Sequence, residues 1–204
     1  IDEVYQYQVN LSKRKEDVIR LIDEKGLLTD ELRDSIMKCS KLVEVEDLYR
    51  PFKEKKKTKA TDAIKNGLEP LAKEIMAFPV KGDINEMAKK YINENVKNVE
   101  EAVNGAKDII AEMVSDNAKL RWAFKDEILK SATIVTKAKK DIEDPNKVYE
   151  MYYDYTEKLS TLANHRVMAI DRAEKEKKLT VSFAYDVNEL EEEAYKAYIT
   201  SSTY

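Results

Sequence analysis

The stretch 98–114, NVEEAVNGAKDIIAEMV, carries the strongest helical pattern in this sequence of 204 residues. Its apolar side chains recur every three or four positions, which places them along one face of an α-helix. Asn98 and Glu101 have the three-residue spacing of a capping box, a motif that begins helices. Gly105 and Ala106 are small, so a neighbouring helix could approach this face closely. The stretch therefore predicts a central helix of the core.

Helical patterns continue on both sides of this stretch. Gly26 stands where a left-handed C-terminal cap would end a first long helix, and Thr29 is a good N-cap for the next helix. The β-branched run 133–136 and the alternating run 179–185 predict short strands, whereas 147–155 is predicted to be helical. We therefore expect a mainly α fold: a multihelical array with helix-turn-helix-like elements and at most two or three short strands in the C-terminal third.

The composition excludes several classes of protein. Hydrophobic residues make up 43% of the chain and charged residues 37%, which is enough apolar material for one large core or two small ones. Only 4 Gly and 4 Pro occur, whereas all-β folds and nucleotide-binding loops need many turn residues or clustered glycines. No apolar run approaches the roughly 20 residues that span a bilayer. With no leader at Ile1, we expect a piece excised from a longer cytoplasmic protein that does not contact a membrane.

Residues for nucleophilic catalysis or metal binding are scarce. The chain has one cysteine, Cys39, and one histidine, His165, far apart in the sequence. A structural zinc site needs about four such ligands, and a catalytic dyad needs its two members side by side. Cys39 continues an apolar stripe with Leu32 and Ile36, so we expect it to be buried and unreactive. The sequence thus predicts a chain that is not an enzyme and that uses no metal and no cofactor.

One segment is strongly basic in a chain whose net charge is −4. Proline disfavours helix at the residue before it, so Arg50-Pro51 predicts an extended segment that leads into a loop. Flexible lysines on a loop attract phosphates without regard to sequence, and the attraction falls steeply with salt. The simpler interpretation, a solvated loop with no ligand, stays open. The candidate nucleic-acid-binding residues are Arg50, Lys53, Lys55, Lys56, Lys57 and Lys59.

A second candidate surface is aromatic. If 147–155 is a helix, Tyr149, Tyr152 and Tyr153 share one of its faces, near lysines that could hold phosphates. Aromatic rings flanked by cations can stack on unpaired bases. A half-buried face that packs on the core is the competing interpretation.

Collinear motifs along nearly the whole chain resemble those of Tex-type transcription accessory proteins. The most specific is EDLYRPFK at 46–53 followed by KKTKAT at 56–61, and a late motif is HRVMAIDR at 165–172. Four such motifs in the expected order are hard to obtain by chance. The others are KNGLEPLA at 65–72 and EAVNGAKDIIAE at 101–112, and the late motif also includes YYDY at 152–155.

The resemblance implies a place in a larger protein. In that family a helical N-terminal region precedes an RNase H-like YqgF domain, helix-hairpin-helix elements and a C-terminal OB-fold, which is the principal nucleic-acid binder. The resemblance implies that 1–140 is the helical N-terminal Tex-like region and that 141–204 is a helical segment with a short strand leading toward the YqgF domain. Expected partners are nucleic acid, bound weakly and nonspecifically, the downstream domains of the same protein, and the transcription machinery.

The sequence departs from the family pattern at a few positions. Arg50, Phe52 and Glu54 stand where an apolar residue, a tyrosine and a proline are expected, and Ala173 replaces a glycine. Glutamate in place of proline would loosen the basic loop.

Two functions of this chain compete. The first is a non-catalytic scaffold with auxiliary binding of RNA or DNA backbone through the basic loop, and the second is a protein-protein interaction scaffold with no nucleic-acid contact of its own.

Overall fold

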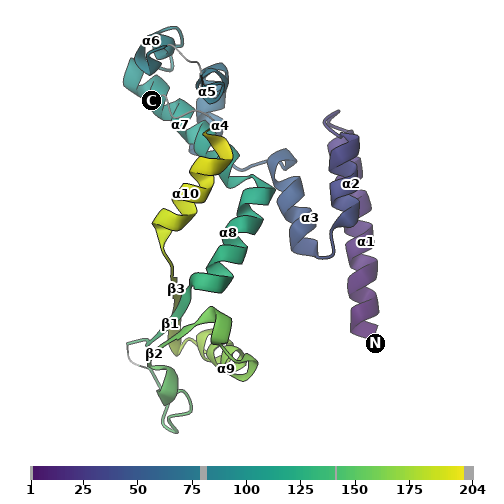
Figure 1. The fold of residues 1–204 in the computed structure, drawn as a ribbon, viewed down its shortest axis with the longest axis vertical. Helices are drawn as coiled ribbons and strands as arrows, with labels where there is room; N and C mark the ends of the chain where they lie inside the picture. Colours follow the sequence, from purple (N-terminus) through teal and green to yellow (C-terminus); the bar gives the residue numbers. More distant parts are fainter. Residues whose placement is uncertain (1, 79–81, 141, 200–204) are drawn as a thin grey trace. The chain divides into compact units, whose positions relative to one another are not determined.

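The computed structural model describes residues 2–78, 82–140 and 142–199, and most of them are helical (Figure 1). The chain divides into two compact units, unit 1 (Ile1–Arg121 with Lys196–Tyr204) and unit 2 (Trp122–Tyr195). Over the described ranges, no helix combines the length and the apolar character needed to cross a membrane. The predicted fold class is confirmed, because helices dominate and the described strands form a single small sheet in the C-terminal part.

Unit 1 contains two groups of helices, each around its own apolar core. The first group comprises α1 (Asp2–Asp23), α2 (Asp30–Lys38) and α3 (Leu42–Tyr49), followed by a 3-10 turn, η1 (Arg50–Phe52). The second group comprises α4 (Lys59–Lys65), α5 (Glu69–Met76), α6 (Ile84–Lys89) and α7 (Val99–Ser115).

The predicted helix boundaries in the first group are confirmed. Gly26 adopts a φ of 68°, and its N–H donates to the carbonyl of Asp23 at 2.8 Å, which closes α1. Thr29 accepts a hydrogen bond from the N–H of Leu32 at 3.2 Å and so caps α2. Cys39 directly follows α2 and is 8% exposed, so its predicted burial is also confirmed.

The prediction of an extended segment at Arg50 is wrong. The 3-10 turn η1 continues directly from α3, and the N–H of Lys53 lies 3.2 Å from the carbonyl of Tyr49. Pro51 fits this turn because its fixed φ is close to the helical value and its missing N–H needs no partner there. Extended backbone begins only at Lys53, where ψ is 138°.

Helix α7 is the centre of the second group, as the sequence predicts. Ala102, Ala106 and Ile109 are buried along one face of α7, against α4, α5 and α6. A Cβ atom at Gly105 would lie 2.3 Å from Cδ1 of Leu68. Only glycine therefore allows this close approach without a shift of the neighbouring side chain, and the predicted close contact is confirmed.

Unit 2 is built on a three-stranded antiparallel sheet in the order β2-β1-β3. The runs predicted as strands, 133–136 and 179–185, correspond to β1 (Thr133–Ala138) and β3 (Leu179–Ala184). Helix α9 (Asn164–Lys175) packs on one face of the sheet (Figure 1). The other elements are β2 (Asp154–Lys158) and the 3-10 turns η2 (Glu150–Tyr152) and η3 (Leu159–Thr161). The helices α8 (Ala118–Ser131) and α10 (Val187–Tyr198) lie mostly in unit 2, and the first residues of α8 and the last residues of α10 belong to unit 1.

The helix predicted over 147–155 is wrong. The carboxylate of Asp144 accepts hydrogen bonds from the N–H groups of Val148 and Tyr149, at 3.1 and 3.0 Å, and from the hydroxyl of Tyr153 at 2.6 Å. These bonds hold the segment in a turn, and the chain then enters β2, which pairs with β1. Local periodicity favours a helix here, but the long-range pairing of β2 overrides it.

The second compact unit begins at Trp122, whereas the predicted boundary lies after residue 140. Strand β1 lies before residue 140 but pairs with both β2 and β3, so the three strands belong to one unit. The assignment of 1–140 and 141–204 to regions of a longer protein stays a prediction.

Candidate nucleic-acid interface

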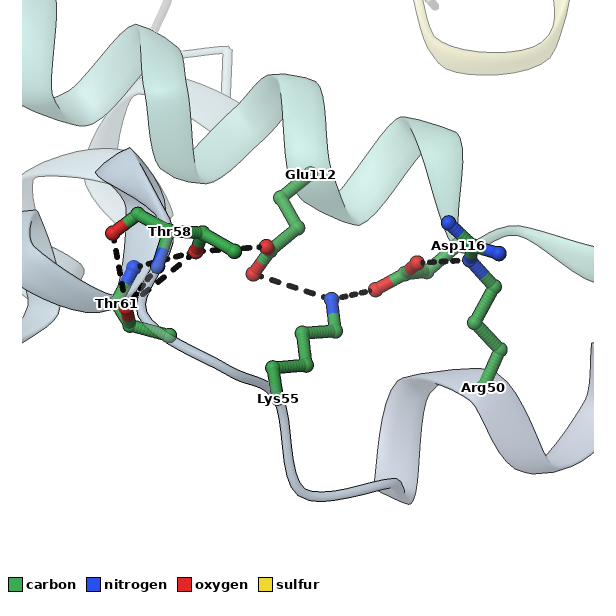
Figure 2. A network of polar contacts seen from close by, with 6 residues as sticks. All are labelled: Arg50, Lys55, Thr58, Thr61, Glu112 and Asp116. Atoms are coloured by element: carbon green, nitrogen blue, oxygen red, sulfur yellow. Dashed lines mark hydrogen bonds and ion pairs between the residues drawn. The ribbon is translucent and has the colours of Figure 1, made fainter.

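The basic loop runs from η1 to the start of α4 and carries all six candidate residues. Asp116 follows the last residue of α7 and is only 6% exposed. Its Oδ1 accepts a hydrogen bond from Nε of Arg50 at 2.8 Å, and its Oδ2 is bound by Nζ of Lys55 (Figure 2). A carboxylate at this position meets the negative end of the helix dipole, and the two cations compensate for that. Arg50 and Lys55 are therefore internal ion-pair partners.

A second carboxylate, Glu112, lies one turn earlier on α7. Its Oε2 is 3.1 Å from Nζ of Lys55, and its Oε1 accepts a hydrogen bond from the hydroxyl of Thr58 at 3.1 Å (Figure 2). Thr58 in turn accepts from the N–H of Thr61 at 3.1 Å and caps α4. Contacts to α7 therefore fix the loop near both of its ends.

The other four candidate residues project into solvent. Lys53, Lys56, Lys57 and Lys59 are exposed. Within the described residues, Lys53, Lys56 and Lys59 make no ion pair. Nζ of Lys57 lies 3.7 Å from the carboxylate of Asp62, but its side chain stays 80% exposed. The expectation that all six cations are free on one loop is therefore corrected, because Arg50, although its side chain is 47% exposed, and the half-buried Lys55 are both paired with Asp116.

A pocket of about 500 Å³ lies between this loop and α7. Five of the six candidate cations line it, together with Glu54 of the loop and Asp108, Glu112 and Asp116. The loop thus faces an acidic edge of α7, which weakens the positive potential that its composition suggests. Sequence reasoning missed this edge, although carboxylates at 108, 112 and 116 recur every four residues and so share a helix face.

The aromatic surface is not available for stacking. Tyr149 and Tyr152 are 4% and 7% exposed and belong to the core of unit 2. The competing interpretation, that these rings pack on the core, is confirmed for both. The hydroxyl of Tyr149 donates to Glu176 at 3.0 Å.

Two further tyrosines of unit 2 donate to carboxylates. The hydrogen bond from Tyr153 to Asp144 raises the pKa of Tyr153 to about 12 and lowers the pKa of Asp144. The hydroxyl of Tyr155 binds Glu157, whose pKa this bond lowers, with a smaller contribution from Arg166 at 2.7 Å. Tyrosine hydroxyls thus hold Asp144 and Glu157 in their ionised form.

The candidate groups for catalysis lie in different units. The thiol of Cys39, in unit 1, donates to the carbonyl of Ser35 at 3.3 Å, and burial raises its pKa. His165 is exposed on α9 of unit 2. Among the described residues, no group of three or more His, Cys, Asp or Glu side chains is arranged to hold a metal ion.

Comparison with known proteins decides the family. Residues 81–203, more than half of the chain, match the family model described as Tex central region-like. The chain belongs to the Tex family. The uncharacterised protein YdcI of Bacillus subtilis is 48% identical over 185 residues, which cover 89% of this chain and 26% of YdcI. The transcriptional accessory protein Tex of Neisseria gonorrhoeae is 33% identical over 183 residues, which cover 90% of this chain and 24% of that protein.

A more distant relative is the S1 RNA-binding domain-containing protein 1 of Pongo abelii. It is 25% identical over 181 residues, which cover 84% of this chain and 18% of that protein. The chain spans about a quarter of the length of the bacterial Tex relatives named above. The resemblance predicted from the motifs is confirmed.

In this Tex-family chain the motif at 46–53 joins helices of unit 1. Oε1 of Glu46 accepts a hydrogen bond from Nε of Arg14, on α1, at 2.5 Å. Oδ1 of Asp47 accepts from Nε of Arg121, on α8, at 2.8 Å. Together with the ion pair at the end of α7, these contacts give Glu46, Asp47 and Arg50 structural partners, whereas Lys53 stays exposed.

Proposed function

We propose that the chain is a non-catalytic helical scaffold of a Tex-type transcription accessory protein, and that its basic loop makes weak, nonspecific contacts to RNA or DNA phosphates. One observation carries the second part. Lys53, Lys56, Lys57 and Lys59 are exposed on a short segment that contacts to α7 fix near both ends. Such a segment can present several cations to one phosphate backbone with little loss of conformational entropy.

The six candidate residues then have two roles. Arg50 and Lys55 position the loop through Asp116, while the exposed lysines meet phosphates. The acidic edge of α7 opposes this contact, so the affinity should be low and strongly dependent on salt. The non-catalytic role rests on the lack of a Cys-His pair, since the single cysteine and the single histidine lie in different units.

The wider role draws on the relatives. The Neisseria gonorrhoeae relative is named a transcriptional accessory protein, and the Pongo abelii relative is named for an S1 RNA-binding domain. A function in transcription, with contacts to the rest of the full-length protein and to the transcription machinery, is part of the proposal.

The test measures binding of labelled single-stranded oligonucleotides at several salt concentrations. In the loop variant, Lys53, Lys56 and Lys57 are all replaced by Gln. Its slope of log affinity against log salt should fall by roughly two, because about 0.7 counterion is released per contact on a single strand. In the control variant, three unit 1 lysines beside carboxylates are replaced, which changes the net charge equally: Lys73→Gln, Lys89→Gln and Lys90→Gln.

A loop variant with native circular dichroism and the same affinity as the control variant would favour the alternative, a protein-protein interaction scaffold. One observation supports that alternative independently. The first turns of α1 expose Val4 and Tyr5, apolar side chains that a protein partner could cover.

A further inference from the structure

The sheet of unit 2 has one covered face and one open face. Ile134 and Leu179 are buried on the face that packs against α9. Successive side chains in a strand point to opposite faces, so the alternate residues point away from α9. Each of these residues is exposed or half-buried, and we call the set the open face. It comprises Thr133, Val135 and Lys137 of β1, Asp154, Thr156 and Lys158 of β2, and Thr180, Ser182 and Ala184 of β3.

The open face is made of hydroxyl groups and cations. Most of its members are threonine, serine or lysine, and its only carboxylate is Asp154, which lies opposite Lys137 in the register. The aromatic side chains of the strands, Tyr155 and Phe183, are paired in register with Thr136 and Ile134 and so belong to the covered face. A ligand would meet hydrogen-bond donors and positive charge here, and no stacking platform.

Like charges face each other where the open face ends. The N–H of Lys139 donates to the carbonyl of Lys178 at 3.0 Å, which continues the pairing of β1 with β3 by one step. Lys139 therefore lies opposite Lys178. Lys140 follows Lys139, and Lys177 precedes Lys178, so these two lysines come next along the two paired segments. Like charges directly opposite each other destabilise a sheet. The chain nevertheless places four lysines at this point.

Lys177 is held there by an unfavourable backbone conformation. Its φ is 60°, at the C-terminal end of α9, where glycine or asparagine is usual. Its N–H donates to the carbonyl of Glu174 at 2.9 Å, so the turn is well defined. A lysine at this position destabilises the fold in two ways, through its left-handed backbone conformation and through repulsion from neighbouring lysines.

Apart from Asp154, which lies opposite Lys137, two nearby carboxylates already have partners. Asp144 is occupied by the hydroxyl of Tyr153 and by two backbone N–H groups. Glu176 binds Lys178 at 3.0 Å and the hydroxyl of Tyr149 at 3.0 Å. Within the part of the chain that the structure describes, Lys137, Lys139, Lys140 and Lys177 are exposed and form no ion pair. Their positive charge is therefore directed to solvent.

We propose that the open face, with Lys137, Lys139, Lys140 and Lys177 at its end, binds the phosphodiester backbone of nucleic acid. The lysines supply the long-range attraction, and the hydroxyls of Thr180 and its neighbours donate hydrogen bonds to phosphate oxygens. At about 3.3 Å per residue, the row from β1 into its lysines extends roughly 20 Å, enough for several phosphates. This site is separate from the basic loop and does not depend on it.

The test uses the 204-residue chain and a labelled single-stranded oligonucleotide. In the sheet variant, Lys137→Gln, Lys139→Gln and Lys140→Gln are combined. Its dissociation constant should rise roughly tenfold and its salt slope should fall by roughly two, relative to the control variant of equal net charge. Its thermal midpoint should not fall, because the repulsion at Lys178 is relieved.

A measurement on the unsubstituted chain gives a second readout. Amide resonances of Thr180 and Ser182 should shift when the oligonucleotide is added, while those of the covered face stay unchanged. Affinity equal to that of the control variant, or no shift on the open face, would overturn the site. Equal competition by an oligoglutamate of the same charge would instead identify the face as a surface for acidic peptides.

The outcome separates this site from the proposed function. Loss of affinity in the loop variant alone would reject the open face and leave the loop in place. Loss in the sheet variant alone would reject the loop and support the open face.

Discussion

Asp116 in unit 1 and three carboxylates in unit 2 are held by different kinds of donor. In unit 1, Asp116 is held by Arg50 and Lys55, which lie 66 and 61 residues earlier in the chain. In unit 2, tyrosine hydroxyls hold the carboxylates of Asp144, Glu157 and Glu176. Both partners of Asp116 are cations, whereas in unit 2 a neutral tyrosine hydroxyl contributes at each carboxylate, alongside Arg166 at Glu157 and Lys178 at Glu176.

The difference decides which positive charges remain for a ligand. Arg50 and Lys55 of the basic loop are engaged in ion pairs, so fewer of its cations are available to bind a ligand than its composition suggests. In unit 2, Lys147, Lys175 and Lys178 pair with carboxylates, whereas Lys137, Lys139, Lys140 and Lys177 are exposed and form no ion pair within the described residues. A count of basic residues along the chain therefore overrates the loop and underrates the sheet.

The largest expected effect tests the close packing around Gly105 of α7, in the core of unit 1. Gly105→Val should lower the stability of unit 1 by about 1–3 kcal/mol, because the new Cβ would overlap the side chain of Leu68. Thermal and denaturant unfolding followed by circular dichroism would measure this. Asn104→Val, on the exposed side of the same helix, is the matched control. Equal midpoints for the two variants would remove α7 from the core.

The next effect breaks the ion pairs directly. Lys55→Met should cost about 1–3 kcal/mol, because Asp116 keeps its buried position but loses one of two cationic partners. The loss measured by denaturant unfolding should shrink at high salt, which already weakens the pairs in the parent chain. Lys56→Met, at an exposed position, should have little effect. If both variants unfold alike, the loop is not fixed by Asp116.

A smaller effect is expected in unit 2. Tyr153→Phe removes the hydroxyl that binds Asp144, and the midpoint of unit 2 should fall by a few degrees. Because the lost donor is neutral, the decrease should be nearly independent of salt, unlike that of Lys55→Met. Tyr185→Phe, at an exposed ring, serves as the control. A decrease that disappears at high salt would contradict the distinction between the two units.

The smallest effect is a pH dependence that sharpens the same distinction. The hydrogen bond from Tyr153 lowers the pKa of Asp144, so its contribution to stability is present above about pH 4 and is lost as the pH falls. The same bond raises the pKa of Tyr153 to about 12, so its contribution is present below about pH 10 and is lost as the pH rises toward about 12. Midpoints measured across this range should show both losses in the parent chain. In Tyr153→Phe the alkaline loss should be smaller.

Local signals in the sequence were sufficient for much of the fold. Gly26 and Thr29 mark a helix end and a helix start through bonds to residues two to four positions away in the chain, which a sequence displays directly. The stripe around Gly105 identified α7 as the central helix, and the collinear motifs from 46–53 to 165–172 identified the family. The β-branched run 133–136 was also sufficient to place a strand.

The tertiary structure decided what depends on distant partners. The segment 147–155 has a helical pattern, but Asp144 holds it in a turn and β1 captures its end as a strand. Likewise, whether a lysine of the basic loop is free or paired depends on α7, whose position relative to the loop only folding sets. Ion pairs and strand pairing act between residues that are far apart in the chain, so patterns of three or four residues do not report them. The sequence by itself therefore determined where helices such as α1, α2 and α7 begin or end and which family the chain belongs to, and only the tertiary structure decided which of its charges face solvent.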